Sequence, residues 1–311
     1  MINLLHIVCP NPALDRTVFL DEFKVNGVSR SHEVKELLGG KGFNVARSYS
    51  FENPNHTYTV HCFFGGYIGK HLQSLAKNQD ISTNITPIKD DTRICSIIVD
   101  NGRDYAHLIN ERGPIISDAE KQKLVDSLLH SVSTGDFVAF SGSLPDGLSD
   151  SFYSDLIISL QAKGAKCVVD TSGKALEKSV DAKPWLIKVN EFEYLELKNK
   201  TARTIEELIE ILKNDEAVEN IIITLGGDGS IAKIHGKYYR ITLPKVNTKN
   251  ATASGDIFLG KLLEAIQTNK DIETALVEAS SFAASNCLYW YPHIDKKDAS
   301  NIKEQIKIVK L

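Results

Sequence analysis

The sequence predicts an α/β protein built on a mainly parallel sheet. Short apolar segments alternate along the chain with segments of helical periodicity, an order typical of βαβ units. Several apolar segments are hydrophobic almost throughout, as parallel strands covered on both faces should be. The predicted strands lie at residues 4–8, 58–64, 136–142, 166–172, 185–190 and 220–227. The predicted helices lie at residues 42–52, 67–78, 117–130, 150–163, 204–213, 255–267 and 272–288.

Two stretches interrupt this alternation, at residues 15–38 and 91–110. Both have the pattern of strands with one polar face, and the second contains "DNGRD", whose Asn-Gly pair is typical of a hairpin turn. We therefore expect a small, mostly antiparallel sheet beside the main one. Because this sheet is divided between two insertions, the sequence favours a lid over a cleft within a single domain spanning residues 1–311.

Composition and charge exclude some classes of function. The chain has 311 residues, of which 42% are hydrophobic and 24% charged, enough for a large core. A net charge of −4 and a pI near 6.2 argue against nucleic-acid binding, which needs a basic footprint. The N-terminus has the pattern of a first strand rather than a secretory leader, and we expect no membrane span and a cytoplasmic location. Five cysteines without a CxxC pair are typical of buried free thiols in a reducing compartment.

The segment "NATASGDIFLG", residues 250–260, is the strongest candidate for phosphate handling. Asp256 opens a segment of helical periodicity, so it can be a helix cap or a catalytic carboxylate. Capping does not need the run Ala253, Ser254 and Gly255 that precedes it. A turn of successive backbone N–H groups stabilises charge during phosphoryl transfer, and an adjacent carboxylate accepts the proton of an attacking hydroxyl. We therefore favour the catalytic interpretation.

Three other glycine-rich turns are weaker candidates. In "GGKGFNVARS", residues 39–48, glycines surround Lys41 and Asn44 falls in the first turn of the next helix, which favours a binding role over a solvated corner. Neither this turn nor "GGYIGKH", residues 65–71, has P-loop spacing, and the second is predicted to be a plain strand-to-helix turn. The spacing in "LGGDG", residues 225–229, fits a hairpin turn and a nucleotide contact equally well.

Other polar residues are candidates for a binding site only when they are considered together. Asn190 and Glu193 lie three residues apart at a strand-to-helix turn, and their oxygens suit a hydrated Mg²⁺, although a capped helix is the simpler interpretation. Asp15 and Arg93 lie in the two lid stretches, where an Asp can bind sugar hydroxyls and an Arg can bind phosphate. For each of these two alone, an exposed charged residue on a sheet is the simpler interpretation.

Taken together and in this order, the motifs resemble those of the PfkB (ribokinase-like) carbohydrate kinase family, along essentially the whole chain. The resemblance is closest to its phosphosugar branch, the 1-phosphofructokinases and tagatose-6-phosphate kinases. The motifs are "NPALD", "GGKGFNVAR", "TR" at 92–93, "INERGP", "SGSLPDG" at 141–147, "DTSG" at 170–173, "NEFE" at 190–193, "LGGDG" and "SGD".

This resemblance implies a ribokinase-like three-layer sandwich with a small β-sheet lid, and an ATP-dependent kinase of a ketohexose monophosphate. It implies that Asp256 is the general base and that Ala253, Ser254 and Gly255 form the anion-binding turn. It also implies a homodimer formed through the lid sheet. On the sugar side it implies Asp15, Gly40, Lys41, Asn44 and Ser141, with Arg93 and Arg30 near the substrate phosphate. On the nucleotide side it implies Lys188, Asn190, Thr224, Gly226, Gly229 and Asn286, with Glu193 and Asn190 organising Mg²⁺ through water.

Some residues depart from the family pattern. The family turn is usually Gly-Ala-Gly-Asp, whereas this chain has Ala-Ser-Gly-Asp at 253–256, and Lys-Val-Asn replaces Lys-Pro-Asn at 188–190. Two alternatives therefore stay open: a kinase of the same fold acting on an unphosphorylated sugar or a nucleoside, and a degenerate kinase that senses a sugar phosphate.

Overall fold

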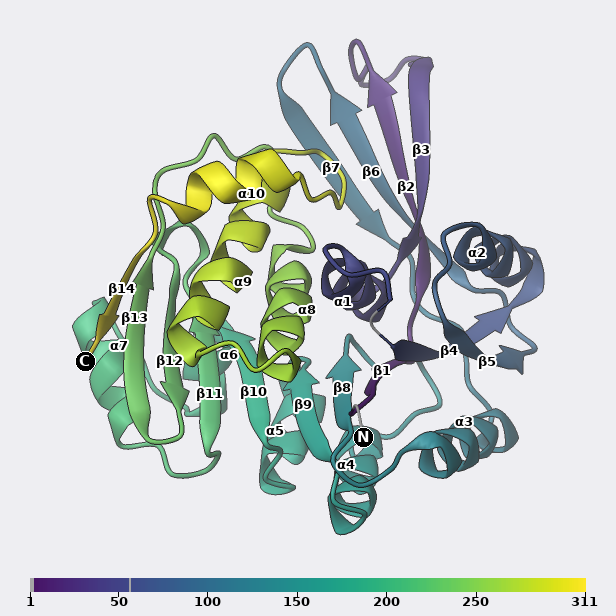
Figure 1. Ribbon diagram of the computed structural model, residues 1–311. Helices are drawn as coiled ribbons and strands as arrows, with labels where there is room; N and C mark the ends of the chain where they lie inside the picture. The colour runs from purple at the N-terminus through teal and green to yellow at the C-terminus, as the bar shows by residue number, and fades with distance from the viewer. Residues whose placement is uncertain (1–2, 56) are drawn as a thin grey trace.

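A ten-stranded sheet dominates the computed structural model, which describes residues 3–55 and 57–311 (Figure 1). The strand order is β14-β13-β12-β11-β10-β9-β8-β1-β4-β5. From β11 to β5 all neighbours pair in parallel, whereas β12, β13 and β14 extend one end by antiparallel pairing. The strands are β1 (Leu5–Cys9), β4 (Tyr58–Gly65), β5 (Thr83–Ile88), β8 (Phe137–Ser141), β9 (Lys166–Asp170), β10 (Leu186–Asn190), β11 (Asn220–Thr224), β12 (Ser230–Ile234), β13 (Lys237–Thr242) and β14 (Lys307–Lys310).

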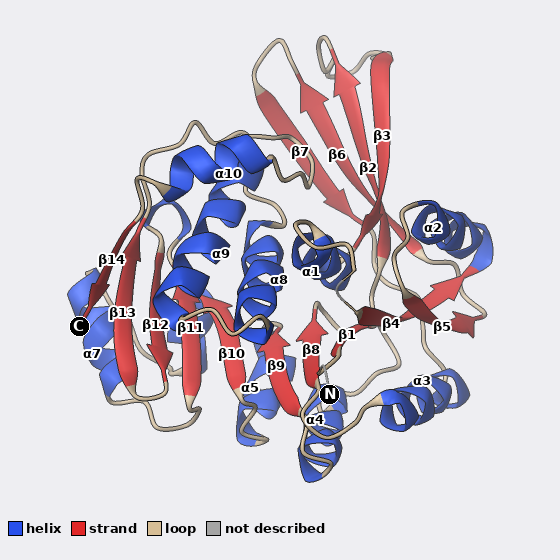
Figure 2. Cartoon of the chain, viewed as in Figure 1, coloured by secondary structure: helices blue, strands red, loops and turns tan. Residues whose placement is uncertain are grey.

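Helices cover both faces of this sheet, which makes three layers (Figure 2). One hydrophobic core lies between the sheet and the helices α1 (Lys41–Ser50), α2 (Gly66–Asn78), α8 (Ser254–Gln267) and α9 (Ile272–Asn286). The other core lies under α3 (Asp118–Ser131), α4 (Phe152–Ala162), α5 (Gly173–Asp181), α6 (Glu191–Leu197) and α7 (Ile205–Lys213). A last helix, α10 (Lys296–Lys303), packs on α8 and α9. Because strands such as β1 and β8 are buried along their whole length, their residues are hydrophobic on both faces.

A second sheet of four strands projects from the main body and is called the small sheet below (Figure 1). Its strands are β3 (Ser31–Gly39), β2 (Ala13–Leu20), β6 (Arg93–Asp100) and β7 (Tyr105–Asn110), in that order. The pairs β2–β3 and β6–β7 are antiparallel, and the central pair β2–β6 is parallel. The predicted fold class, a mainly parallel sheet with a smaller sheet beside it, is confirmed.

Several elements were not predicted from the sequence, and each has a physical reason. The edge strand β5, "TNITPI", is half polar and contains Pro87, so it lacks the continuous hydrophobic pattern of a central strand. The antiparallel strands β12 to β14 mix polar with apolar residues, so they lack the continuous hydrophobic pattern on which the strand predictions rested. The "LGGDG" segment forms the tight turn between β11 and β12, with the short helix η1 (Gly226–Asp228) inside it.

The helices α1 and α8 are held tightly together. Ser48 Oγ donates a hydrogen bond to the backbone oxygen of Ile257 at 2.6 Å. A Cβ on Gly260 would collide with the backbone oxygen of Val45, so only glycine permits this approach. The catalytic candidate at the start of α8 is therefore fixed relative to the binding candidates at the start of α1.

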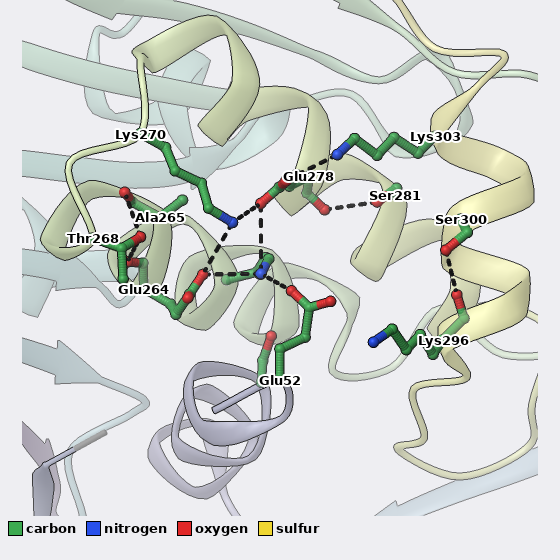
Figure 3. A network of polar contacts seen from close by, with 12 residues as sticks. Glu52, Glu264, Ala265, Thr268, Lys270, Glu278, Ser281, Lys296, Ser300 and Lys303 are labelled. Carbon is green, nitrogen blue, oxygen red and sulfur yellow. Dashed lines mark hydrogen bonds and ion pairs between the residues drawn. The ribbon is translucent and has the colours of Figure 1, made fainter. Parts of the chain in front are cut away.

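An ionic network reinforces this contact at the other end of the two helices (Figure 3). The ammonium group of Lys261 on α8 is 1% exposed and pairs with Glu52, which follows α1, and with Glu264 at 2.9 Å. It also lies 3.5 Å from Glu278 on α9. Two further lysines complete the network at Glu278: Lys270 at 2.6 Å and Lys303 at 2.9 Å. Three lysines thus neutralise three glutamates and tie α1, α8, α9 and α10 into one unit.

All five cysteines carry free thiols, and those of Cys9, Cys62 and Cys167 are buried. Within the described part of the chain, none of the helices is both long and apolar enough to cross a membrane.

A buried histidine pair predicts that the fold loses stability in acid. His6 on β1 and His61 on β4 lie with Nδ1 and Nε2 3.1 Å apart. Burial lowers the pKa of His61 to about 3, and the neighbouring His6 adds to this effect. The unfolded chain has the ordinary pKa of about 6.5 and takes up protons first as the pH falls. The stability from neutral His61 is therefore full above pH 6.5 and is lost below it.

We expect His61 to account for about 2 kcal/mol of the unfolding free energy lost between pH 7 and pH 5. The measurement is urea unfolding of wild type and His61→Gln at both pH values. Between pH 7 and pH 5 the variant should lose about 2 kcal/mol less unfolding free energy than wild type. His235→Gln, at an exposed histidine paired with Glu219, is the control and should behave as wild type. An identical pH dependence for His61→Gln and wild type would contradict the assignment.

Candidate active site

The candidate site lies along the edge of the main sheet where the parallel strands end. Ser141, Asp170, Asn190 and Thr224 are the last residues of β8, β9, β10 and β11. Ligands of open α/β sheets bind outside this carboxyl edge. The strand ends therefore bring four dispersed motifs of the sequence to one side of the molecule.

The turn formed by residues 250–255, called the 250–255 turn below, leads into α8. Ala253 is the N-cap residue and has a left-handed backbone with φ 68°, and the helix start has no side-chain cap. The first N–H groups of a helix have no partner inside it, so those of Gly255 and Asp256 are available to an anion. A Cβ on Gly255 would lie 3.0 Å from Lys188 Nζ, which places an ammonium group beside these N–H groups. The turn has the features of a phosphate site.

Asp170 lies between two lysines next to this turn. Lys41 Nζ is 2.8 Å from its Oδ1 and Lys188 Nζ is 2.8 Å from its Oδ2. Burial alone would raise the pKa of Asp170, but the two ammonium groups outweigh burial and lower it to about 2. Asp170 is therefore a permanent negative charge that holds one lysine from the start of α1 and one from β10.

Asp256 is 5% exposed and is held from α1. Asn44 Nδ2 donates to Asp256 Oδ2 at 3.0 Å, and Lys41 Nζ lies 3.8 Å from Oδ1. Burial raises the pKa of Asp256 to about 6 against the opposing charge of Lys41, and the negative Asp170 adds to the rise. The result is a carboxylate that is still ionised near pH 7 and is a stronger base than an ordinary Asp.

Arg47 supports this contact from one helical turn further along α1. Its Nη1 donates to Asn44 Oδ1 at 2.6 Å, and its Nη2 donates to the backbone oxygen of Leu38 at 3.0 Å. The amide of Asn44 is thereby oriented so that its NH₂ group points at Asp256. Gly40, with φ 98°, is the N-cap residue of α1 and begins this segment.

The sugar-side candidates lie where the small sheet joins the main body. Asp15 on β2 is partly buried, and burial raises its pKa to about 6 against Arg47 and Arg93. Arg93 Nη2 donates to the backbone oxygen of Asn11 at 2.9 Å, and Nη1 donates to that of Glu111 at 3.3 Å. The simpler interpretation of Asp15 and Arg93, as exposed charges on a sheet, is therefore wrong.

Three buried polar atoms on this side have no hydrogen-bond partner among the residues that the structure describes. They are Ser141 Oγ, Asn11 Oδ1 and Arg93 Nε. Buried polar groups are usually paired, so each of these atoms is a candidate contact for a polar ligand. The structure does not bring Arg30 to this place. Leu20 pairs with Ser31 at the end of the small sheet opposite Ala13 and Gly39, and Arg30 precedes Ser31.

The nucleotide-side candidates are engaged in local structure. Asn190 and Glu193 form a reciprocal capping box at the start of α6, with two hydrogen bonds of 2.8 Å. Thr224 Oγ1 donates to the backbone oxygen of Val189 at 3.3 Å. Gly226 and Gly229 lie in the β11–β12 turn with φ values of 56° and 96°.

Asn286 on α9 is buried and holds the 250–255 turn. Its Nδ2 donates to the backbone oxygen of Thr252 and to Ser254 Oγ, both at 2.8 Å. Its side-chain oxygen accepts a hydrogen bond from the N–H of His293 at 3.0 Å. The contact of Asn286 with a nucleotide stays a prediction, and its position in this structure is that of a brace for the turn.

Sequence reasoning missed Asp170, Arg47 and Asn11 as site residues. Signals in the sequence could have identified the first two of these residues. Asp170 is polar at the end of an apolar strand, where ligands of parallel sheets bind, and Arg47 lies three residues after Asn44 on the same helical face. Asn11 lies in the quoted "NPALD" motif, but its missing partner is visible only in the fold.

Comparison with known proteins agrees with this geometry. Residues 11–292 match the model of the pfkB family carbohydrate kinases. The chain is 29% identical over 309 residues to a tagatose-6-phosphate kinase of Staphylococcus epidermidis, covering 97% of this chain and 98% of that protein. It is 28% identical over 274 residues to a 1-phosphofructokinase of Bacillus subtilis, covering 88% of each.

A solved structure shows the same architecture. The crystal structure of a putative phosphofructokinase from Staphylococcus aureus superimposes with a TM-score of 0.83 at 26% identity, covering 99% of each chain. The predicted ribokinase-like fold is thereby confirmed. With the family match extending over most of its length, this chain belongs to the pfkB family of carbohydrate kinases.

Proposed function

We propose that the protein is an ATP-dependent kinase of a ketohexose monophosphate, of the fructose 1-phosphate or tagatose 6-phosphate type. One observation carries the proposal: a buried carboxylate of raised pKa, Asp256, lies beside an uncapped helix start and two lysines. This is what phosphoryl transfer to a hydroxyl needs, namely a base for the proton and donors for the developing charge.

Each residue of the site has a distinct part in this reaction. Asp256 accepts the proton of the sugar hydroxyl as that oxygen attacks phosphorus. The N–H groups of Gly255 and Asp256 donate to the equatorial oxygens, and Lys188 places positive charge beside them. Asn44 keeps the carboxylate of Asp256 turned towards the substrate side.

The residues present suit ATP and Mg²⁺. The uncapped helix start and Lys188 fit a phosphate group. Asn190 Oδ1 and Glu193 Oε2 each accept one hydrogen bond from a backbone N–H, so their remaining lone pairs would hold Mg²⁺ through water. When bound, Mg-ATP supplies the transferable phosphoryl group and neutralises part of its charge.

The fixed position of Arg93 supports a phosphorylated sugar. Two backbone oxygens hold its guanidinium group, while its Nε has no partner among the described residues. An unphosphorylated sugar would leave the buried Nε donor of Arg93 unpaired, which is costly. Lys41, predicted to lie on the sugar side, instead pairs with Asp170 and Asp256, so Arg93 is the stronger candidate for the substrate phosphate.

We extend the proposal to the small sheet, as a lid over the site and as the contact surface of a homodimer. Its outer strand β7 exposes Tyr105, Leu108 and Ile109, each at least half exposed, and β3 exposes Val34. Apolar side chains on an exposed sheet edge favour pairing with a second copy of the chain. The dimer and the closing movement remain predictions.

The first prediction of the proposed function tests the activity. Wild type should release ADP from ATP and Mg²⁺ with fructose 1-phosphate, tagatose 6-phosphate or fructose 6-phosphate, and not with the free sugars or nucleosides. Asp256→Asn should lose about 100- to 10,000-fold in turnover, the usual contribution of a general base. Because ionised Asp256 is buried, the variant should be at least as stable as wild type in thermal unfolding. Turnover by Asp256→Asn within threefold of wild type would rule out its role, and thermal stabilisation by phosphosugars without ADP release would favour the sensor.

A second prediction concerns Ala253. Its left-handed backbone costs an alanine about 1 kcal/mol relative to glycine, while its methyl packs on the cluster around Ile257 and Phe282. We expect Ala253→Gly to raise the unfolding free energy by about 0.5 kcal/mol and to leave turnover equal or higher. Ala251→Gly, at an exposed position of the same turn without positive φ, is the control and should not be stabilised. A destabilised Ala253→Gly would show that the methyl contact outweighs the backbone strain.

A third prediction concerns pH. The pKa values of Asp256 and Asp15 are both raised to about 6, so kcat/KM should fall below about pH 6 as the pair takes up protons. Asn44→Ala removes a hydrogen bond to the carboxylate form of Asp256, which raises the pKa of Asp256. The acid limb of the kcat/KM profile should therefore move to higher pH, and activity should also fall. Ser50→Ala is the control: its hydroxyl lies on the same helix, bonds the backbone oxygen of Ala46 and the side chain of Tyr58 rather than Asp256, and its loss should leave the limb in place. An acid limb below pH 5 in wild type would contradict the raised pKa.

A further inference from the structure

The segment after α9, residues 288–293 with the sequence "LYWYPH", lies between the small sheet and the 250–255 turn and is called the aromatic loop. It belongs to the main body, and Figure 1 shows it in yellow beside the base of β7. The proposed reaction does not use its side chains directly. Its contacts nevertheless reach both halves of the site.

On one side the aromatic loop covers the inner face of the small sheet. Tyr291 OH accepts a hydrogen bond from Lys35 Nζ on β3 at 2.7 Å. The ring of Tyr291 stands edge-on to Phe19 on β2, with centroids 6.5 Å apart and planes at 88°. Trp290 packs on the same cluster, which consists of Phe19, Ile97 and Val99. The small sheet thus completes its own core with two aromatic rings from the body.

On the other side the aromatic loop holds the 250–255 turn. Asn250 Nδ2 donates to the backbone oxygen of Trp290 at 2.9 Å, and Asn250 Oδ1 accepts from the N–H of Thr252 at 2.9 Å. Asn286 donates to Thr252 and Ser254 while it accepts from the N–H of His293. The turn is therefore fixed by hydrogen bonds that begin and end on the aromatic loop.

These contacts form one continuous path from the sheet that carries Asp15 to the turn that precedes Asp256. A shift of the small sheet changes the position of Tyr291 and Trp290, and the backbone of Trp290 is bonded to the turn. Two sites are coupled when one element contacts both and is biased by both ligands.

We propose that Trp290 and Tyr291 are positioning residues that make the geometry of the 250–255 turn depend on the position of the small sheet. This inference rests on the proposed function, in which a phosphosugar binds under the small sheet and the nucleotide phosphates bind at the turn. Binding of the phosphosugar fixes the small sheet, the aromatic loop follows, and the N–H groups of Gly255 and Asp256 are set for the phosphoryl group.

The chemical consequence is protection of ATP from water. In hydrolysis a water oxygen bonds to the γ-phosphorus, the bond from phosphorus to the ADP oxygen breaks, and the water proton leaves to Asp256 or to solvent. A turn that is correctly set only when the small sheet is engaged disfavours this reaction while no sugar is bound. The aromatic loop would then raise the ratio of sugar phosphorylation to hydrolysis.

The test measures the dissociation constant of a non-hydrolysable ATP analogue by calorimetry, with and without the phosphosugar that reacts best in the substrate panel. In wild type we expect the phosphosugar to tighten nucleotide binding at least about fivefold. Tyr291→Ala and Trp290→Leu should reduce this factor to less than twofold and raise ATP hydrolysis without sugar relative to sugar phosphorylation.

The neighbouring Tyr289 provides a matched control. Its OH donates to Asp298 on α10 at 2.9 Å rather than to the small sheet, so Tyr289→Phe should keep the wild-type factor. Milder variants cover the case in which the larger changes impair folding. Tyr291→Phe removes the hydrogen bond between body and sheet, and Lys35→Met removes it together with the contact of Lys35 with the Tyr291 ring and with Glu33. Each should lower the factor, and the double variant should lower it no further than Lys35→Met alone.

The outcomes separate this inference from the proposed function. A wild-type factor of one, or an unchanged factor in all four loop and sheet variants, overturns the coupling role while phosphosugar turnover still stands. Absence of turnover with every phosphosugar overturns the proposed function itself. A merely structural role would lower the melting temperature of the variants and leave the coupling factor as in wild type.

Discussion

The carboxylate of Asp170 lies between the ammonium groups of Lys41 and Lys188, and the order of the site depends on this buried charge arrangement. Removing one partner of a buried ion pair leaves an uncompensated charge and costs about 3–5 kcal/mol. This cost applies to the fully buried pair of Asp170 and Lys188. Lys41 comes from the start of α1, Asp170 from the end of β9 and Lys188 from β10, so the pairing also fixes these elements relative to one another.

The packing of α1 on α8 supplies the second constraint. Asn44 and Asp256 meet at one end of this helix pair, the contact of Ser48 with Ile257 lies between, and the network around Lys261 closes the other end. Helix pairs slide or rotate when only apolar side chains connect them, whereas hydrogen bonds and the close approach at Gly260 admit one register. A carboxylate whose basicity depends on burial needs this precision, because a small opening would admit water and lower its pKa again.

Part of the site could be predicted from the sequence because some of its residues lie at a helix start, a position that commonly binds ligands. Asp256 and Gly255 open a helix, so local pattern alone could identify them, whereas Lys188 and Asn190 became site candidates through the family resemblance. The pairing of these side chains could not be predicted from local pattern, because the partners are far apart in the sequence. Lys41 and Asp170 are 129 residues apart, and Asn44 and Asp256 are 212 apart. Lys41 was accordingly placed with the sugar alone, whereas the fold makes it a partner of both carboxylates. The left-handed backbone of Ala253 was also not predicted, because alanine rarely adopts it; the glycine usual at this position of the family turn is consistent with it.

Under the proposed function, the charge balance predicts that the helix start contributes more than the lysines to holding a phosphoryl group. Lys41 and Lys188 are matched by Asp170 and Asp256, so the four side chains together carry almost no net charge when both carboxylates are ionised. An arriving phosphate must then find its attraction in groups that are not already neutralised. The N–H groups of Gly255 and Asp256 are such groups, since the helix start has no side-chain cap. Because the raised pKa of Asp256 arises first from burial, the base strength exists before any ligand binds, and the ligand has only to meet donors that are already in place.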